Sequence, residues 1–114
     1  MIDSIPMEKI ENRETEQKKA LEESLRQICF LLADVKDDAV IYDFFNCLFT
    51  PSELEDFAKR WLLVCEIDAG TSQREIAKKF SISLCKITRG SKELKKPDSA
   101  FRKFLEIAKN LRRP

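Results

Sequence analysis

The length and composition of this chain favour a single small, helix-rich protein. It has 114 residues, with 43% hydrophobic and 36% charged side chains but only two Gly and four Pro. A chain of this size normally forms one domain, and this composition excludes the disordered and collagen-like classes. No apolar run approaches the roughly 20 residues that span a bilayer, and the first residues do not form a signal peptide. We therefore expect a cytoplasmic protein.

Charge is divided unevenly along the chain. Overall, 21 Lys and Arg nearly balance 20 Asp and Glu, for a net charge of +1. Residues 1–70 hold 8 basic and 16 acidic side chains (net −8), whereas residues 71–114 hold 13 basic and 4 acidic side chains (net +9). This asymmetry favours a C-terminal part that binds a polyanion. A solvated basic surface without a partner is the alternative, because charge alone specifies no fold.

The residues that carry chemistry exclude most catalytic and metal-binding classes. The chain has no His, and no two of its four cysteines form a C-x-x-C pair, so we expect no metal site. Each cysteine lies in an apolar helical run, which predicts core or near-core positions for Cys29, Cys47, Cys65 and Cys85. Cys85 is the only plausible nucleophile. Without a His base or a phosphate-binding glycine loop, we expect no enzyme.

Apolar spacing predicts an all-α fold with a polar N-terminal arm over residues 1–17 and a single helical domain over residues 18–114. The first helix is expected from Lys18 to Val35. Its apolar residues recur at steps of three or four, which places them on one face of an amphipathic helix. They are Leu21, Leu25, Ile28, Leu32 and Val35.

The next segment, residues 39–49, is too apolar all round for a surface helix. Something must cover both of its faces, and a chain of 114 residues encloses such a segment with difficulty. We therefore expect a second subunit to contribute, in an intertwined or extensive dimer interface. A central core helix of a monomer is the alternative.

A helix start is encoded at residues 50–53. Thr50 is a predicted N-cap, Pro51 suits the first helical position, and Glu53 can close a capping box. The helix should run to about Ala69, where Gly70 can end it in a left-handed conformation. Its predicted inward stripe is Leu54, Phe57, Ala58, Trp61, Val64 and Cys65.

Residues 72–90 match a helix-turn-helix pattern. Ser72, with Glu75 three residues later, is a predicted N-cap of the first helix, and Ser83 is a predicted N-cap of the second. The positions predicted to pack inward are Ile76, Phe80, Ile82, Leu84 and Ile87, with the small Ala77 where the helices approach closely. A helical hairpin that packs without binding DNA is the alternative.

The exposed side chains of this segment form a predicted DNA-binding surface. In a helix-turn-helix protein the second helix enters the major groove and reads base edges, while neighbouring side chains hold phosphates. Arginine suits a base edge because its guanidinium group matches the two acceptors of guanine, and lysines supply electrostatic affinity. The predicted DNA-binding residues are Gln73, Arg74, Lys78, Lys79, Ser83, Cys85, Lys86, Thr88, Lys92 and Lys95, with Lys96 adding charge.

Several segments resemble the trp operon repressor family. They are L-F-T-P-S-E at residues 48–53, Arg60, G-T-S-Q-R-E-I at residues 70–76, and above all I-T-R-G-S at residues 87–91, followed by Leu94 and Lys95. The resemblance covers residues 48–108 and, in pattern only, residues 18–47. It implies an intertwined all-helical homodimer with six helices per chain. It also implies a transcriptional repressor whose partners are double-stranded operator DNA and the corepressor L-tryptophan.

The same resemblance implies a tryptophan site. The indole ring would lie between the guanidinium groups of Arg60 and Arg89, because planar cations stack on aromatic rings. The ligand carboxylate would meet Arg89, and Glu93 would lie near the ligand amino group. Thr50, Gly90, Val64 and the main chain around Cys47 and Phe49 would complete the pocket.

This sequence departs from the family pattern at five places. The loop after Gly70 is one residue shorter, Trp61 replaces a small aliphatic residue, Ala77 a lysine, Lys86 a threonine and Glu93 a serine. The leading interpretation is a tryptophan-dependent repressor. The alternative is a DNA-binding regulator of the same fold that responds to another ligand or to none, with the gap filled by Trp61 or Glu93. A module that binds only protein would need an acidic partner for the basic half.

Overall fold

The computed structural model describes residues 6–111, and within that range all regular structure is helical, which confirms the all-α class. The six helices are α1 (Met7–Val35), α2 (Asp38–Leu48), α3 (Pro51–Asp68), α4 (Gln73–Phe80), α5 (Leu84–Lys95) and α6 (Ala100–Asn110). The chain divides into two compact units, Met1–Cys47 and Leu48–Pro114. The single domain predicted for residues 18–114 stays a prediction, because it concerns how the two units combine.

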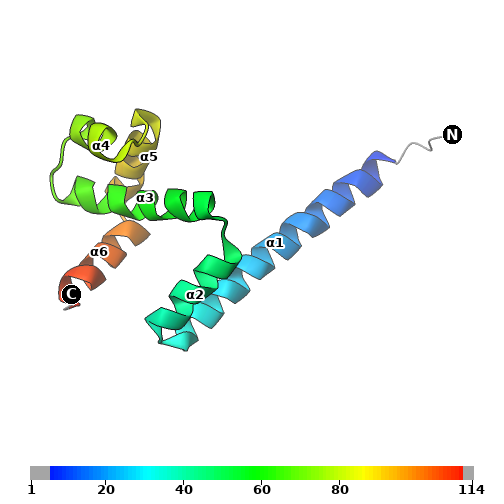
Figure 1. Ribbon diagram of the computed structural model, residues 1–114. Coiled ribbons are helices and arrows are strands. Elements are labelled where there is room, and N and C mark those ends of the chain that lie inside the picture. The colour runs from blue at the N-terminus through cyan, green and yellow to red at the C-terminus, as the bar shows by residue number, and fades with distance from the viewer. Residues whose placement is uncertain (1–5, 112–114) are drawn as a thin grey trace. The chain divides into compact units, whose positions relative to one another are not determined.

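The first unit is a helical hairpin in which α2 folds back along the C-terminal part of α1 (Figure 1). Lys36 adopts a left-handed conformation with φ 51°, and the Asp37 carboxylate accepts hydrogen bonds from the Ala39 and Val40 amides at 3.0 and 3.4 Å. These contacts end one helix and begin the next. The helix α1 begins at Met7 rather than at Lys18. Of the polar arm predicted for residues 1–17, residues 1–5 lie outside the described residues and residues 7–17 are helical.

The apolar faces of this hairpin are uncovered in the single chain. No described residue of α1 or α2 is buried, and the exposed fractions of Leu21, Leu25 and Val40 are 64%, 63% and 50%. A hollow of about 260 Å³ runs between the helices and is lined only by apolar side chains. They are Ile28, Leu31, Leu32, Val35, Val40, Ile41 and Phe44. The predicted apolar face of the first helix therefore exists, but nothing in this unit closes it.

The N-terminal cap of α3 follows the predicted capping box. The Thr50 hydroxyl accepts a hydrogen bond from the Glu53 amide at 3.2 Å, and the Glu53 carboxylate accepts one from the Thr50 amide at 2.9 Å. Pro51 occupies the first helical turn. The helix ends at Asp68, and Gly70 has a φ of 87°, as predicted.

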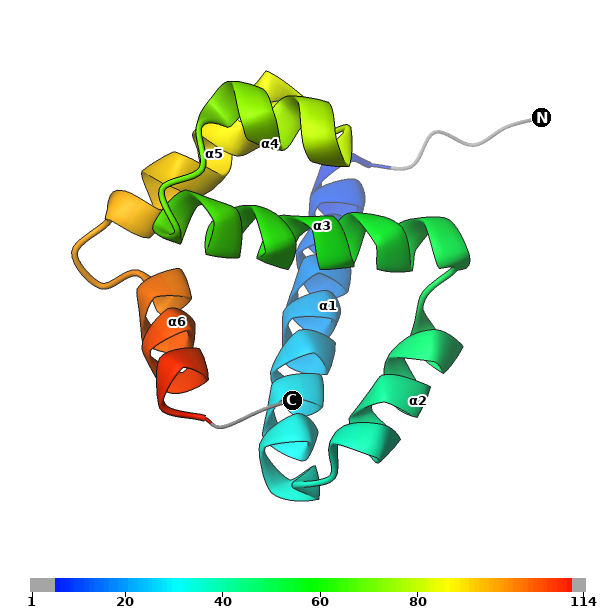
Figure 2. The ribbon, with the colours of Figure 1, turned by 60° about the vertical axis from the view of Figure 1, so that its left-hand side comes forward.

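The second unit is built around α3, with α4 and α6 on opposite sides of it (Figure 2). Leu63 is 3% exposed and packs with Ile residues of the α4–α5 segment, while Val64 is 1% exposed and packs with Leu94 and Leu105. The predicted stripe was wrong in placing Phe57, Ala58 and Trp61 inward, since all three are exposed, Phe57 at 47% and Trp61 at 37%. The buried face of α3 is rotated toward Leu63, because α4 and α5 pack on that side.

The cysteines differ from the sequence prediction. Cys29, Cys47 and Cys85 are exposed, and only Cys65 is partly buried, so the core assignment was wrong for three of the four. Their apolar runs face outward in the single chain. Burial, together with the neighbouring Asp68 and Glu66 carboxylates, raises the pKa of the Cys65 thiol. Among the described helices, none is long and apolar enough to cross a membrane.

An ion-pair network joins α3 to α6. The Asp68 carboxylate contacts Lys109 Nζ at 3.0 Å and Arg102 Nη1 at 2.9 Å. The side chain of Asp68 is 17% exposed. Hydrogen bonds from Lys109 and Arg102 lower the pKa of Asp68, although desolvation opposes them. The charged form of Asp68 therefore stabilises the folded unit.

We expect this network to make stability depend on pH in the acid range. A carboxyl group whose pKa falls on folding contributes stability that is present above its unfolded pKa, about 3.9, and is lost as the pH falls through the folded value. Asp68→Asn should therefore lower the unfolding midpoint in urea at pH 7, and the deficit should shrink toward pH 2. Glu106→Gln is the control, because Glu106 forms no ion pair within residues 6–111. A deficit independent of pH would contradict the assignment.

Candidate functional site

The helices α4 and α5 are joined by a capped three-residue turn, as predicted. The Ser72 hydroxyl accepts a hydrogen bond from the Glu75 amide at 3.2 Å, and the Ser83 hydroxyl accepts one from the Lys86 amide at 3.3 Å. Ser81 takes a left-handed conformation with φ 54°, and Ile82 turns into the core at 5% exposure. The turn therefore fixes the direction in which α5 leaves α4.

Three isoleucines hold this helical pair against α3. Ile76 and Ile87 are fully buried, and they pack with Ile82 and with Leu63 of α3. Leu84 does not join them. It is 55% exposed, so the prediction that it packs inward was wrong. Leu84 instead lines a hollow along α5 together with Cys85 and Thr88.

Gly90 lies where α5 packs closely against α3. A Cβ atom at this position would lie 3.0 Å from Cδ2 of Leu63. A side chain at position 90 would therefore require the end of the Leu63 side chain to shift by a few tenths of an ångström. In this unit Gly90 therefore packs against α3 and does not line the cleft described below.

The residues predicted to bind DNA all lie on the surface of the α4–α5 segment. Every one of the ten is exposed, from Gln73 at the start of α4 to Lys95 at the end of α5. Cys85, Thr88, Arg89 and Lys92 share one face of α5 along a shallow hollow that also includes Glu93 and Lys96. The Lys96 ammonium group is paired with the Glu93 carboxylate at 2.8 Å, which leaves a face of mainly positive charge.

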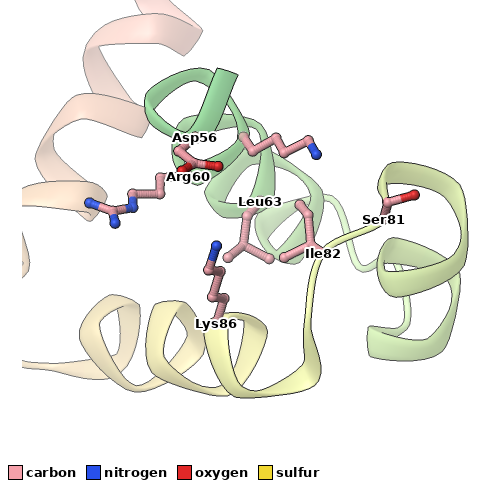
Figure 3. A pocket seen from close by; sticks show the side chains of 7 residues that line it. Asp56, Arg60, Leu63, Ser81, Ile82 and Lys86 are labelled. Carbon is pink, nitrogen blue, oxygen red and sulfur yellow. The ribbon is translucent and has the colours of Figure 1, made fainter. Parts of the chain in front are cut away.

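A separate cleft of about 160 Å³ lies between α3, the turn and α5 (Figure 3). Its apolar floor is made by Leu63 and Ile82, which are 3% and 5% exposed. Charged side chains surround this floor. The lining residues are Asp56, Lys59, Arg60, Leu63, Ser81, Ile82 and Lys86.

The cleft contains only one of the six residues predicted to bind tryptophan. Arg60 lines it, whereas Arg89 and Glu93 line the hollow on the outer face of α5. The Thr50 hydroxyl is engaged in its helix cap, and Val64 is buried between α3, α5 and α6. Within this unit, Arg60 and Arg89 therefore do not bound one common gap.

Trp61 and Glu93, the two residues that could fill a gap between Arg60 and Arg89, do not line the cleft. The Trp61 ring packs edge-on against Phe104 of α6, with centroids 6.3 Å apart, and the Glu93 carboxylate is held by Lys96. Sequence reasoning missed five lining residues and assigned a sixth, Lys86, to DNA binding. The missed residues are Asp56, Lys59, Leu63, Ser81 and Ile82. The helical spacing of positions 56, 59, 60 and 63 was a usable signal, because it places them on one face of α3.

Comparison with known proteins defines the class of this protein. Residues 23–109 match the family model described as Trp repressor protein. The chain belongs to this family, whose members are transcriptional regulators and not enzymes.

Three relatives, each named a Trp operon repressor homolog, illustrate the similarity. The chain is 42% identical to one from Chlamydia caviae over 84 residues, which cover 73% of this chain and 80% of the relative. It is 35% identical over 77 residues to one from Chlamydia trachomatis serovar D, covering 67% and 82% of the two chains. It is 33% identical over 90 residues to one from Xylella fastidiosa strain M23, covering 78% and 91%. No solved structure matches significantly.

Proposed function

We propose that this protein is a cytoplasmic, sequence-specific DNA-binding repressor that acts as a homodimer and uses L-tryptophan as corepressor. The observation that carries the proposal is the α4–α5 segment. Two capped helices are anchored by Ile76, Ile82 and Ile87, and they expose Arg74, Thr88 and a row of lysines. A helix-turn-helix protein needs this combination of a rigid support and a basic outer face.

Sequence discrimination is assigned to the exposed N-terminal parts of α4 and α5. The N-terminus of a recognition helix lies deepest in the major groove, and side chains there reach base edges. Arg74 and Thr88 have exposed side chains in this segment. Lys78, Lys79, Lys92 and Lys95 supply phosphate contacts, because ammonium groups attract the DNA backbone without regard to sequence.

The uncovered hairpin supports the homodimer. Helices in folded proteins gain most of their stability from packing an apolar face, and no described residue of α1 or α2 is buried in one chain. A second copy of this chain is proposed to cover the apolar faces of the hairpin. A two-fold dimer presents the same patch from both subunits and thus covers both at once. In helix-turn-helix dimers the two recognition helices bind half-sites about 34 Å apart, and we expect the same spacing here.

Two observations support L-tryptophan as the ligand. The family match and the names of the relatives connect this chain to regulation of a trp operon. The cleft beside Arg60 also opens next to α5, so a molecule bound there contacts the proposed recognition helix. A regulator of the same fold that responds to another ligand is the second candidate, because Arg89 does not line this cleft.

Selection from a pool of random-sequence duplexes, in the presence of L-tryptophan, tests the DNA-binding proposal. The expected product is a palindrome whose half-sites are centred about one helical turn apart, bound with a steep dependence on salt concentration. Enrichment of no sequence, or affinity that is insensitive to salt, would contradict it.

Arg74→Ala should weaken binding to the selected duplex by about 1–3 kcal/mol and weaken binding to random DNA much less, because the variant can no longer bind a base edge. Lys79→Ala is the matched comparison on the same helix, and it should weaken binding to both duplexes alike. Electrophoretic mobility shift titrations with both DNAs measure this difference. Equal losses for Arg74→Ala on the two duplexes would show that Arg74 contacts only the DNA backbone.

A further inference from the structure

The charged side chains that line the α3–α5 cleft differ in whether they form ion pairs. Lys59 is neutralised by Glu55 at 3.1 Å. Asp56, Arg60 and Lys86 form no ion pair among the described residues, although all three line the same cleft. The cleft therefore offers two cations and one carboxylate that form no ion pair within residues 6–111.

The position of Lys86 distinguishes it from the other lysines of the basic half. Figure 3 shows its ammonium group directed from α5 toward the end of α3 that carries Asp56 and Arg60. Lys92 and Lys96, by contrast, line the hollow on the outer face of α5. Lys86 is exposed, but it lines the cleft between α5 and α3 and not the hollow on the outer face of α5.

The cleft is complementary to a zwitterion that carries an apolar side chain. A carboxylate placed between Arg60 and Lys86 would receive charge-assisted hydrogen bonds, and an ammonium group beside Asp56 would donate to its carboxylate. Leu63 and Ile82 form an apolar floor for the remainder of the molecule. A free amino acid with an apolar side chain carries all three of these groups.

We infer that Lys86 and Asp56 are the residues that select the ligand of this cleft, Lys86 by binding the carboxylate and Asp56 by binding the ammonium group of a free amino acid. This inference rests on the proposed function, in which that amino acid is L-tryptophan. It gives Lys86 a role in ligand recognition in place of the DNA contact expected from the sequence. Each of the two charges of the ligand should therefore add to its affinity.

Calorimetric titration with three probes tests this assignment. L-tryptophan carries both charges, indole-3-propionate lacks the ammonium group, and tryptamine lacks the carboxylate. Lys86→Gln should weaken L-tryptophan and indole-3-propionate binding by about 10- to 100-fold and leave tryptamine unaffected, because one charged hydrogen bond is removed. Asp56→Asn should weaken L-tryptophan and tryptamine binding and leave indole-3-propionate unaffected.

Lys92→Gln is the matched control, since Lys92 lies on the same helix outside the cleft. It should leave the affinity for all three probes unchanged. It should also reduce the salt dependence of ligand-free DNA binding by about one unit, because one lysine no longer neutralises a phosphate. Lys86→Gln should leave that salt dependence unchanged. Circular dichroism of each variant checks that the helices are intact, as expected for exposed side chains.

Three results would overturn the assignment. They are unchanged L-tryptophan affinity in Lys86→Gln, equal weakening of all three probes, and a reduced salt dependence of DNA binding in that variant. In each of these cases the wild-type protein still binds L-tryptophan and DNA, so the proposed function stands. A wild-type protein that binds its selected duplex but no L-tryptophan would overturn both this assignment and the corepressor role.

Discussion

Ile87→Ala should lower the free energy of unfolding by about 2–5 kcal/mol, because it removes a fully buried side chain from the cluster that holds α4 and α5 against α3. The cost includes the cavity left among Leu63, Ile76 and Ile82, which a helix packed this closely cannot easily close. Affinity for the selected duplex should fall with it, since the packing that orients the outer face of α5 is weakened.

Leu84→Ala is the matched control for Ile87→Ala. Both changes remove a branched apolar side chain from α5, but Leu84 is 55% exposed in this unit. Its removal should change the free energy of unfolding by less than about 0.5 kcal/mol, as for most surface substitutions. Urea unfolding at one fixed protein concentration compares the two, because dimer stability depends on concentration. Similar destabilisation of the two variants would contradict the placement of α5.

Val40→Asp should raise the dissociation constant of the dimer by about 100-fold or more. Val40 lines the apolar hollow of the hairpin and is 50% exposed in the single chain. Burial of a valine contributes about 1.5–3 kcal/mol, and a two-fold interface contains the residue twice. The introduced carboxylate adds a desolvation cost if it is buried without a partner.

Sedimentation equilibrium over a range of protein concentrations measures this change. Asp43→Asn is the control, since Asp43 is an exposed polar residue on the same helix and does not line the hollow. It should leave the dissociation constant nearly unchanged. A folded wild-type monomer at micromolar concentration, or unaltered dimerisation of Val40→Asp, would contradict the homodimer.

The elements with local signals were predictable from the sequence. Caps act within three or four residues, so Thr50 with Glu53, Ser72 and Ser83 could be located without knowledge of the fold. Gly70 could be placed for the same reason, since a left-handed residue after a helix favours glycine. The class of fold followed from these signals together with apolar spacing.

Features that depend on tertiary packing were less predictable. Apolar spacing predicts an amphipathic helix. It does not predict which of two apolar faces packs against the neighbouring helices. Leu63 rather than Phe57 therefore faces the α4–α5 pair, and Leu84 stays exposed. The outward Cys29 and Cys47 have the same explanation, because they lie on the α1 and α2 helices, whose apolar faces are uncovered in the single chain.

The candidate site was likewise predictable where local signals determine it and less predictable where tertiary packing does. The exposed residues of α4 and α5 were found from the pattern of the segment, since caps and buried positions leave a definite outer face. The lining of the cleft was found only in part, because it depends on the angle at which α5 crosses α3. That angle brings Lys86 to the cleft and leaves Arg89 and Glu93 on the other hollow.

Affinity for the selected duplex, measured with and without saturating L-tryptophan, tests the central claim most directly. A ligand raises DNA affinity only as far as it prefers the DNA-binding arrangement, and the coupling is reciprocal. We therefore expect tighter DNA binding with L-tryptophan, and tighter L-tryptophan binding by the same factor when the duplex is present. A DNA affinity that does not change with L-tryptophan would contradict a tryptophan-dependent repressor.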